Sequence, residues 1–449
     1  MSDSPRVWYH TFGCKANQYD TERIRQETES RGAVSVDAPE GADIAVVNTC
    51  TVTNQAEANA RHLLRRLRRE RPDLRIVVAG CSTAVREADY LDMPETDAVV
   101  AGHDPVRVAD AMRALGLAGG PGDDPGLLRR NARGTRGWLK IQDGCDRKCS
   151  FCATRVARGS SVSRPVAEVV EEARLLARRH PELVLTGIHI GHYGLDLEPP
   201  VSLARLCAAL LEAVDCRLRL SSIEATEIDD DLVDLMRGSR GQVAPHLHVP
   251  LQSGSDDILR LMRRWHTREA YRSRVLAIAE AVEPLGLGAD IIVGFPGETA
   301  AHHAETRALV EELPYSYLHV FPYSVRDGTA AASLPDRVPG DVAAERSREL
   351  RELGVAKGRA HRRRRAGTAA DIIVERGVAS GEPGVGLTGD YLRTEVTGDA
   401  RPGDRLTATL SLEGDRLVAL PTAPSNSASA RRLATRAMPV RRSLPTLAP

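Results

Sequence analysis

The hydrophobic pattern of the first 120 residues alternates short β-branched runs with amphipathic stretches. Strands are predicted at "RVWYH", "DIAVVN", "RIVVAG" and "DAVVAG", and helices at "YDTERIRQETESRG" and "NQAEANARHLLRRLRRERP". Strands that alternate with helices in this way form a parallel sheet covered by helices. The stretch "GLAGGPGDDPGLLRRNARG" follows, and its glycine, proline and aspartate content is typical of a linker.

A second and longer alternation begins at "GWLKIQ". Its strands are predicted at "LVLTG", "RLRLSSI", "HLHVPL", "GADIIVGF" and "YLHVFPY", with helical patterns between them. About six βα units in roughly 200 residues predict an open or partial (β/α) barrel, whose chemistry lies at the carboxyl ends of the strands.

The hydrophobic pattern of the chain changes after the long polar helix predicted around "DVAAERSRELRELGVAKGRAHRRRRAG". The segments "AADIIVERG", "VGLTGDYLRTEV", "DRLTATLSLEG" and "RLVALP" read as short alternating strands separated by turns, which predicts a small all-β barrel. The last residues lack a core pattern, and we expect them to be disordered.

Composition narrows the classes of function. Lysine plus arginine equals aspartate plus glutamate at 61 each in 449 residues, so affinity for nucleic acid must come from local basic patches. Two such patches are "RHLLRRLRRERPDLR" and "RAHRRRRAG", and the second precedes the predicted small barrel, a combination that favours RNA binding. No apolar run approaches the roughly 18 residues of a membrane span, and the N-terminus does not resemble a signal peptide. We therefore expect a cytoplasmic protein with no membrane contact.

The most specific chemical signal is "QDGCDRKCSFC", which places Cys145, Cys149 and Cys152 directly after the first barrel strand. We call these three the barrel trio. In a reducing compartment, clustered thiols indicate metal ligation, and ligation by thiolates alone selects zinc or an iron–sulfur cluster. A structural zinc site closes with four protein ligands, whereas this loop offers three. A cubane cluster held by three cysteines leaves one iron free for a small molecule.

Three more cysteines, Cys14, Cys50 and Cys81, form a second set, the N-terminal trio. Each follows a predicted strand, in "TFGCKANQ", "NTCTVTN" and "AGCSTA". Open α/β sheets gather ligand sites at the carboxyl ends of their strands, so the three thiols are expected to meet and hold a second centre. The other cysteines, Cys207 and Cys216, lie in apolar surroundings and are expected in the core.

Other strand ends are candidates for ligand contact. Thr186 and Gly187 end "LTG", and Gly294 lies in "GFPGET", where a glycine permits close approach of a ligand to the backbone. We predict these three residues on the cofactor side of the barrel. Two histidine pairs, His189 with His192 and His246 with His248, are expected to serve packing or substrate contact.

The C-x3-C-x2-C loop after a first barrel strand resembles the radical S-adenosylmethionine superfamily. With "GCKANQYDTE", "NTCTVTNQAE", "LSSIEATEI", "HLHVPLQSGSDDILRLM" and "DIIVGFPGET", the chain to about Leu420 resembles a methylthiotransferase. The expected organisation is a multidomain α/β protein. It comprises a Rossmann-like parallel α/β domain at 4–120, a linker at 121–134, a partial (β/α) radical SAM barrel at 135–362, a TRAM RNA-binding β-barrel at 363–425 and a disordered tail at 426–449.

The resemblance implies two 4Fe-4S clusters and S-adenosylmethionine as cofactors. The barrel trio would be catalytic, since it would hold the cluster that binds and reductively cleaves S-adenosylmethionine. The N-terminal trio would hold the auxiliary cluster that receives and delivers sulfur. A 5′-deoxyadenosyl radical would take hydrogen from carbon 2 of an adenine, where a methylthio group is installed, and a second S-adenosylmethionine would donate the methyl. The implied partners are tRNA and an electron donor such as flavodoxin or ferredoxin.

Three branches of the family differ in substrate. The pairing of "GCKANQYDTE" with "KIQDGC" and "GLTGDYLRTEV" is most similar to the branch that converts N6-threonylcarbamoyladenosine, next to the anticodon of tRNA, into its 2-methylthio derivative. The alternatives are the branches that act on isopentenyladenosine in tRNA or on an aspartate of a ribosomal protein. An alternative of another class is a zinc-bearing RNA-binding protein in which both trios are structural.

Overall fold

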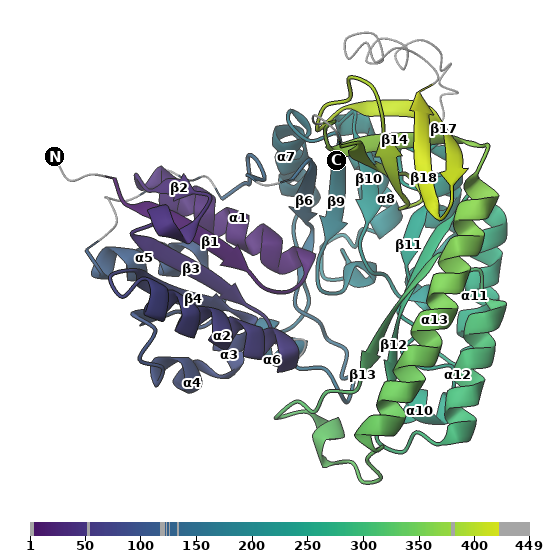
Figure 1. Ribbon diagram of the computed structural model, residues 1–449, viewed down its shortest axis with the longest axis horizontal. Coiled ribbons are helices and arrows are strands. Elements are labelled where there is room, and N and C mark those ends of the chain that lie inside the picture. The colour runs from purple at the N-terminus through teal and green to yellow at the C-terminus, as the bar shows by residue number, and fades with distance from the viewer. Residues whose placement is uncertain are drawn as a thin grey trace.

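The structure is a computed structural model that describes residues 4–51, 54–116, 122, 124, 126–132, 134–378 and 382–421. An α/β domain stands beside a larger open barrel, and a small β-barrel lies against one end of the open barrel (Figure 1). The predicted disordered tail at 426–449 and part of the predicted linker lie outside the described residues. Within the described ranges, no helix combines the length and hydropathy that a membrane crossing needs.

The N-terminal domain is built on five parallel strands in the order β2-β1-β3-β4-β5. They are β1 (Arg6–Thr11), β2 (Val34–Val36), β3 (Ile44–Thr49), β4 (Arg75–Gly80) and β5 (Ala98–Val99). The helices are α1 (Lys15–Ser30), α2 (Asn54–Glu70), α3 (Cys81–Val85), α4 (Glu87–Leu91) and α5 (Pro105–Ala114). The parallel α/β prediction is confirmed. The strand order is the doubly wound order of flavodoxin-type folds, whereas dinucleotide-binding Rossmann sheets have the order 3-2-1-4-5-6.

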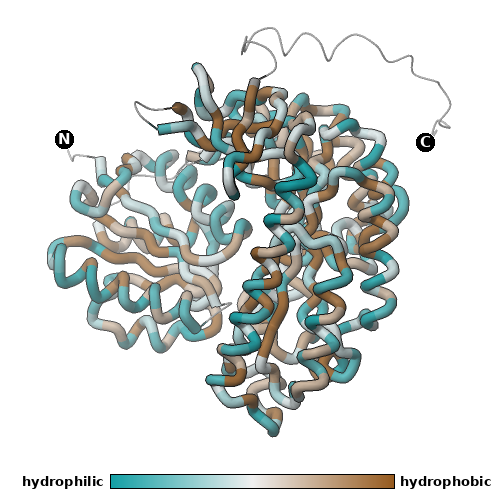
Figure 2. Tube along the Cα trace, turned by 45° about the vertical axis from the view of Figure 1, so that its right-hand side comes forward, coloured by the Kyte–Doolittle hydropathy of each residue, from teal (hydrophilic) through white to brown (hydrophobic). Residues whose placement is uncertain are grey.

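Both faces of this sheet are buried, which explains its near-continuous apolar strands. Ile24 of α1 and Met112 of α5 pack on one face, and Leu64 of α2 with Tyr90 of α4 pack on the other. Figure 2 shows the same pattern, with hydrophobic strands between helices whose outer surfaces are hydrophilic.

The central region forms six parallel strands around an open barrel. They are β6 (Arg136–Lys140), β9 (Glu182–Thr186), β10 (Arg217–Leu220), β11 (His246–His248), β12 (Gly286–Val293) and β13 (Tyr317–Pro322). Two three-stranded sheets, β10-β9-β6 and β11-β12-β13, are joined by parallel bridges from Leu218 to Val243 and from Ser222 to His248. The predicted partial barrel is confirmed.

Helices alternate with these strands, and most of them cover the outside of the barrel (Figure 1). They are α6 (Thr154–Arg158), α7 (Val166–Ala177), α8 (Leu203–Ala213), α9 (Asp230–Gly238), α10 (Asp256–Leu261), α11 (Arg268–Ala281), α12 (Ala300–Glu312) and α13 (Gly340–Arg365). A short antiparallel pair, β7 (Gln142–Asp143) and β8 (Val162–Ser163), flanks the cysteine loop. Short 3-10 helices lie at Pro39–Gly41, Ile190–His192, Ala225–Glu227 and Ala330–Ser333. Cys207 and Cys216 are buried in the barrel core, as expected.

The C-terminal region is a closed barrel of five strands in the order β14-β15-β16-β18-β17. They are β14 (Ala369–Arg376), β15 (Gly384–Thr388), β16 (Arg393–Val396), β17 (Arg405–Glu413) and β18 (Arg416–Pro421). Alternate apolar residues such as Ile372, Leu410 and Ala419 fill its interior. The predicted small all-β barrel is therefore confirmed.

Buried charges join the two barrels. Glu182 accepts hydrogen bonds from Arg217 Nε at 2.5 Å and Arg219 Nε at 2.8 Å. The other guanidinium nitrogens reach the small barrel, where Arg217 binds the Leu387 carbonyl at 3.2 Å and Arg219 binds the Gly389 carbonyl at 2.9 Å. All three charged side chains are fully buried. Although burial by itself raises the pKa of Glu182, the charges of Arg219 and Arg217 hold it below its ordinary value.

Replacing Glu182 with glutamine tests this junction, because the change keeps the shape but removes the anion that Arg217 and Arg219 share, while Arg217 keeps its ion pair with Asp371 at 3.1 Å. We expect Glu182→Gln to lower the free energy of unfolding by about 3–5 kcal/mol. Calorimetry should show a lower Tm. The matched control is Glu311→Gln, which removes a half-exposed carboxylate 2.9 Å from Arg307 and should change stability by about 0.5 kcal/mol or less. Equal Tm values for both variants would contradict a stabilising role for the buried carboxylate.

Candidate functional site

The barrel trio lies on a loop that leaves the carboxyl end of β6. The Cys145 amide donates to the Gly159 carbonyl at 3.1 Å, and the Cys152 amide donates to the Cys149 carbonyl at 3.2 Å. Gly144 has φ of 68°, and a Cβ there would lie 1.8 Å from the Ser160 carbonyl oxygen. The glycine in "QDGC" is therefore required for the loop to close on itself.

Gln142 fastens this loop to the next strand. Its side-chain nitrogen donates to the Gly144 carbonyl at 2.7 Å and to Ser161 Oγ at 2.8 Å. Its side-chain oxygen accepts from the amides of Ile188 at 3.0 Å and His189 at 2.8 Å. Because Gln142 is fully buried, these bonds fix the start of the cysteine loop against the carboxyl end of β9.

Nitrogen donors surround the thiols of the barrel trio. Cys145 Sγ lies 3.5 Å from His189 Nδ1, and the other ring nitrogen of His189 lies 2.8 Å from Glu227. Arg264 Nη1 donates to Cys149 Sγ at 3.6 Å, and Nη2 of the same guanidinium donates to Glu224. Burial raises the pKa of Cys149 to about 11, an effect that the Arg264 charge opposes. The third thiol, Cys152, is exposed.

The N-terminal trio occupies three neighbouring strand ends. Cys14 caps α1 after β1, Cys50 follows β3, and Cys81 begins α3 directly after β4. A Cβ on Gly13 would lie 2.8 Å from Cys50 Sγ, so the segment before Cys14 lies against Cys50. Asn17, one turn into α1, accepts a hydrogen bond from Cys81 Sγ at 3.4 Å. The sheet thus gathers the three cysteines at one edge, as the sequence predicts.

Arg158 connects the two cysteine regions. It ends α6, just beyond the barrel trio, and Figure 1 places α6 beside α3. Its Nε donates to Cys81 Sγ at 3.2 Å, and its Nη2 donates to Asn17 Oδ1 at 2.6 Å. The guanidinium also bonds Asp20 at 2.6 Å and Asp143 at 2.9 Å, and its side chain is only 1% exposed.

Lys140 completes this network, with its amine 2.6 Å from Asp20 and 2.9 Å from Asp143. Two carboxylates, one from each domain, therefore lie between two cations from the barrel. The sequence pattern singles out none of Arg158, Asp20 and Lys140. The run "ATRVARG" in which Arg158 lies carries no periodic or metal-ligand signal, and its partner Cys81 is 77 residues away.

The residues predicted on the cofactor side have close neighbours within the protein. Thr186 is buried at the end of β9. A Cβ on Gly187 would lie 2.8 Å from the Gln142 carbonyl oxygen, and a Cβ on Gly294 would lie 2.7 Å from Ala343 Cβ. These close contacts leave no room for a side chain at either position, which explains why both residues are glycine. A contact of the three residues with S-adenosylmethionine remains a prediction.

Three other sets of ligand atoms each lie within 4.8 Å of one another: His189, His192 and Glu227; His248, Asp290 and His319; and Asp20, His103 and Asp143. Among the described residues, neither cysteine trio brings its three sulfur atoms this close.

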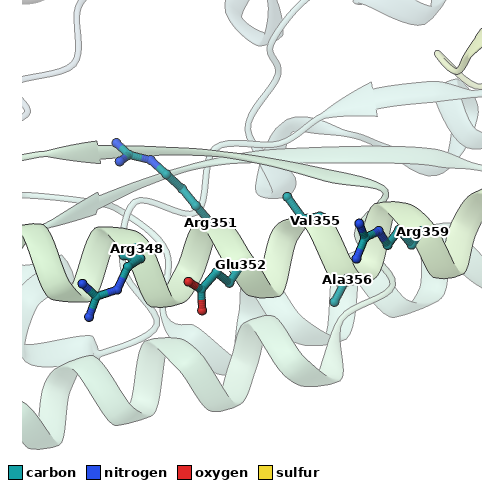
Figure 3. A pocket seen from close by; sticks show the side chains of 6 residues that line it. All are labelled: Arg348, Arg351, Glu352, Val355, Ala356 and Arg359. Atoms are coloured by element: carbon teal, nitrogen blue, oxygen red, sulfur yellow. The ribbon is translucent and has the colours of Figure 1, made fainter. Parts of the chain in front are cut away.

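The basic block near the end of α13 is divided in two. Arg365 and His361 are buried and bond Asp390 of the small barrel at 2.9 and 3.1 Å, whereas Arg363 and Arg364 are exposed. Earlier on the same helix, three arginines are among the residues that line a pocket (Figure 3). It is lined by Arg348, Arg351, Glu352, Val355, Ala356 and Arg359. The helix therefore offers both an anchor for the small barrel and exposed positive charge.

Comparisons with known proteins agree with this geometry. Residues 6–102 match the family described as "Uncharacterized protein family UPF0004", and residues 139–310 match the radical SAM superfamily. The threonylcarbamoyladenosine tRNA methylthiotransferase MtaB of Bacillus subtilis (strain 168) is 36% identical over 415 residues, which cover 87% of this chain and 90% of that protein. The Thermotoga maritima protein of the same name is 33% identical over 84% of this chain and 88% of its own length.

One further relative with a different named substrate and one solved structure are also similar to this chain. A tRNA-2-methylthio-N(6)-dimethylallyladenosine synthase of Cereibacter sphaeroides (strain ATCC 17025 / ATH 2.4.3) is 35% identical over 93% of this chain and its full length. Among solved structures, the radical S-adenosylmethionine methyltransferase TsrM of Kitasatospora setae, with cobalamin and a 4Fe-4S cluster bound, has a TM-score of 0.52. It is 15% identical and covers 73% of this chain and 77% of that one, so it supports the fold alone.

Three observations agree: a cysteine loop after the first strand of a partial barrel, a second trio at the edge of a parallel sheet, and relatives above 30% identity along most of the chain. The chain therefore belongs to the methylthiotransferase family of radical SAM enzymes.

Proposed function

We propose that this enzyme installs a methylthio group on carbon 2 of N6-threonylcarbamoyladenosine, next to the anticodon of tRNA, and forms 2-methylthio-N6-threonylcarbamoyladenosine. Relatives with that named substrate align along 78–87% of the chain. The observation that carries the proposal is the pairing of two cysteine trios from different domains, joined by the buried Arg158 guanidinium.

The donor sets fit the cofactors of the family, S-adenosylmethionine and 4Fe-4S clusters. The barrel trio would hold the cluster that binds S-adenosylmethionine, and the N-terminal trio would hold the auxiliary cluster. Each trio supplies three cysteine side chains that form no disulfide, and thiolates are the ligands of iron–sulfur clusters. When bound, these groups supply a 5′-deoxyadenosyl radical that can take hydrogen from carbon 2, and the sulfur and methyl that replace it.

The chain's own residues set the electrostatics around the ligands. Burial raises the pKa of Cys81 to about 12, and Arg158 opposes this with a hydrogen bond and a positive charge. Burial also raises the pKa of Cys149, and Arg264 opposes this with its positive charge and a hydrogen bond. Because buried thiolates are costly without compensating charge, the two arginines stabilise the ionised form that a metal requires. An unactivated aromatic C–H has no acidic proton, so this arrangement suits radical chemistry better than general base catalysis.

The remaining assignments follow from the architecture. We assign residues 4–120 to the auxiliary cluster domain, 135–362 to the radical SAM core and 363–425 to an RNA-binding barrel of the TRAM type, with 121–134 as the linker. The exposed Arg363 and Arg364 next to this barrel suit contacts with RNA phosphates. The electron required for cleavage would come from a donor such as flavodoxin or ferredoxin, in the cytoplasm, where tRNA is modified.

The substrate is tested by mass spectrometry of tRNA nucleosides from a strain that lacks this gene. We expect 2-methylthio-N6-threonylcarbamoyladenosine to disappear and its precursor without the methylthio group to accumulate. Restoring the gene should restore the product. The second candidate substrate is dimethylallyladenosine, because the Cereibacter relative covers even more of the chain. Loss of the 2-methylthio derivative of that nucleoside alone would show the second candidate to be right.

The division of labour between the trios is tested with Cys149→Ala and Cys50→Ala. We expect Cys149→Ala to abolish cleavage of S-adenosylmethionine, and Cys50→Ala to keep most cleavage but stop methylthio transfer. Each variant should bind about four fewer irons per chain, as expected for the loss of one cubane cluster. Cys207→Ala is the control, because Cys207 is buried in the apolar core and belongs to neither trio. This variant should retain both activities. Loss of cleavage in both trio variants alike would contradict separate roles.

Metal content distinguishes this proposal from a zinc-bearing RNA-binding protein. Anaerobically purified protein should be brown, and its visible absorption should bleach on reduction. Elemental analysis should find iron and sulfide together. A colourless protein with stoichiometric zinc would show both trios to be structural.

A further inference from the structure

A pocket lies on the surface of the N-terminal domain, outside both cysteine trios. It is formed between the carboxyl end of β1 and the first part of α2 and has a volume of about 360 Å³. Its lining residues are His10, Phe12, Asn59, His62, Leu63 and Arg66. The volume lies within the range of pockets that hold small ligands. Because Phe12 is two residues before Cys14, the pocket adjoins the segment that carries the first cysteine of the N-terminal trio.

A row of rings on β1 forms one wall of this pocket. Trp8, His10 and Phe12 alternate along the chain, so their side chains share one face of the sheet. The ring centres of Trp8 and His10 lie 5.3 Å apart, and those of His10 and Phe12 lie 4.6 Å apart. Trp8 is buried in the core beside α2, whereas His10 and Phe12 are only half-buried. The uncovered part of this row is therefore a surface on which a further ring can stack.

The other wall belongs to a basic face of α2. Four exposed residues at positions i, i+3, i+4 and i+7 share this side of the helix: His62, Arg65, Arg66 and Arg69. Glu70 lies 4.0 Å from Arg66 and 3.7 Å from Arg69, whereas Arg65 has no acidic partner among the described residues. Exposed ion pairs on a helix are weak, and three arginines face one glutamate. This face therefore keeps a net positive charge.

The remaining arginines of α2 have partners within the domain. Arg61 lies 3.0 Å from Asp89, and Arg68 lies 2.5 Å from Asp97 and also donates to backbone carbonyls. These two side chains stabilise the fold. The basic run that the sequence analysis singles out on this helix is thus divided between structural arginines and a separate exposed set beside the pocket.

Rings beside exposed guanidinium groups are typical of a surface that binds single-stranded nucleic acid. An unpaired base stacks on an aromatic side chain, and its phosphate pairs with arginine. An apolar partner would leave the arginines without anions, and an acidic protein would leave the half-buried rings without a stacking partner. The combination of rings and positive charge therefore favours a nucleotide as the occupant.

We infer that the pocket between β1 and α2 binds an unpaired nucleotide of the anticodon loop of tRNA. The base stacks against Phe12 and His62, and the phosphate pairs with Arg66. This inference rests on the proposed function, and it assigns to the N-terminal domain a share of tRNA binding besides that of the small barrel. Because Phe12 is so close to Cys14 in the chain, this contact brings the loop to the N-terminal trio.

The test measures equilibrium binding of an anticodon stem-loop RNA that carries N6-threonylcarbamoyladenosine. The full-length enzyme with its clusters reconstituted is used anaerobically without S-adenosylmethionine. His62→Ala should bind this RNA at least about five times more weakly than the wild type, because a stacking ring is lost. His62→Phe keeps a ring and should bind within about twofold of the wild type. Both variants should keep the iron content of the wild type, since His62 is exposed.

The charged contact is tested with Arg66→Gln. This variant should bind about fivefold more weakly and lower the slope of log affinity against log salt concentration by about 0.7–0.9, as the loss of one phosphate contact implies. Arg113→Gln is the matched control, because the Arg66 and Arg113 side chains are each 56% exposed and each lies near an acid of its own helix. Arg113 lies on α5, which packs on the other face of the sheet, and its variant should bind as the wild type does.

A set of abasic RNAs shows that a base fills the pocket. Each loop nucleotide other than the target is replaced in turn by one without a base. At one position, this replacement should weaken binding by the wild-type enzyme at least about fivefold and leave binding by His62→Ala unchanged. If every replacement has the same effect on both enzymes, no base stacks on His62 and the inference is wrong.

The outcomes separate the inference from the proposed function. Wild-type affinity in both His62→Ala and Arg66→Gln overturns the inference, even when the enzyme forms the 2-methylthio product. An equal loss of affinity in Arg113→Gln also overturns it, because the effect would then be one of overall charge. If the His62 and Arg66 variants bind RNA normally but slow the cleavage of S-adenosylmethionine supported by flavodoxin, the surface binds an acidic protein instead. If the wild-type enzyme shows the expected dependence on His62 and Arg66 but forms no product from this RNA, the proposed function is wrong and the RNA site stands.

Discussion

The Arg158 guanidinium donates to Cys81, Asn17, Asp20 and Asp143, and almost none of its surface reaches solvent. A buried cation of this kind is stable only when its anions stay in place, so it holds the N-terminal domain and the barrel in one relative position. Lys140 strengthens the same contact by bonding one carboxylate from each domain. The placement of one cysteine trio relative to the other depends on these few bonds.

A second set of buried charges holds two domains together at the opposite end of the barrel strands. Glu182 orders Arg217 and Arg219, which then bind backbone carbonyls of the small barrel. This barrel therefore lies at the amino ends of the strands, and the cysteine loop lies at their carboxyl ends. A frame with the small barrel at one end and the cysteine loop at the other suits the proposed reaction on a base of tRNA.

The sequence by itself determined the three regions and most of their strands and helices, although not β2 or α5, and it singled out the six cysteines of the two trios, because hydrophobic period and cysteine spacing are local properties of the chain. Tertiary structure alone decided the strand order β2-β1-β3-β4-β5 and the contact of Arg158 with Cys81. Arg158 and Cys81 are 77 positions apart, and the neighbouring strands of the sheet are separated by whole helices or loops. Neither periodicity nor a motif encodes such distances, and they follow only from how the domains pack.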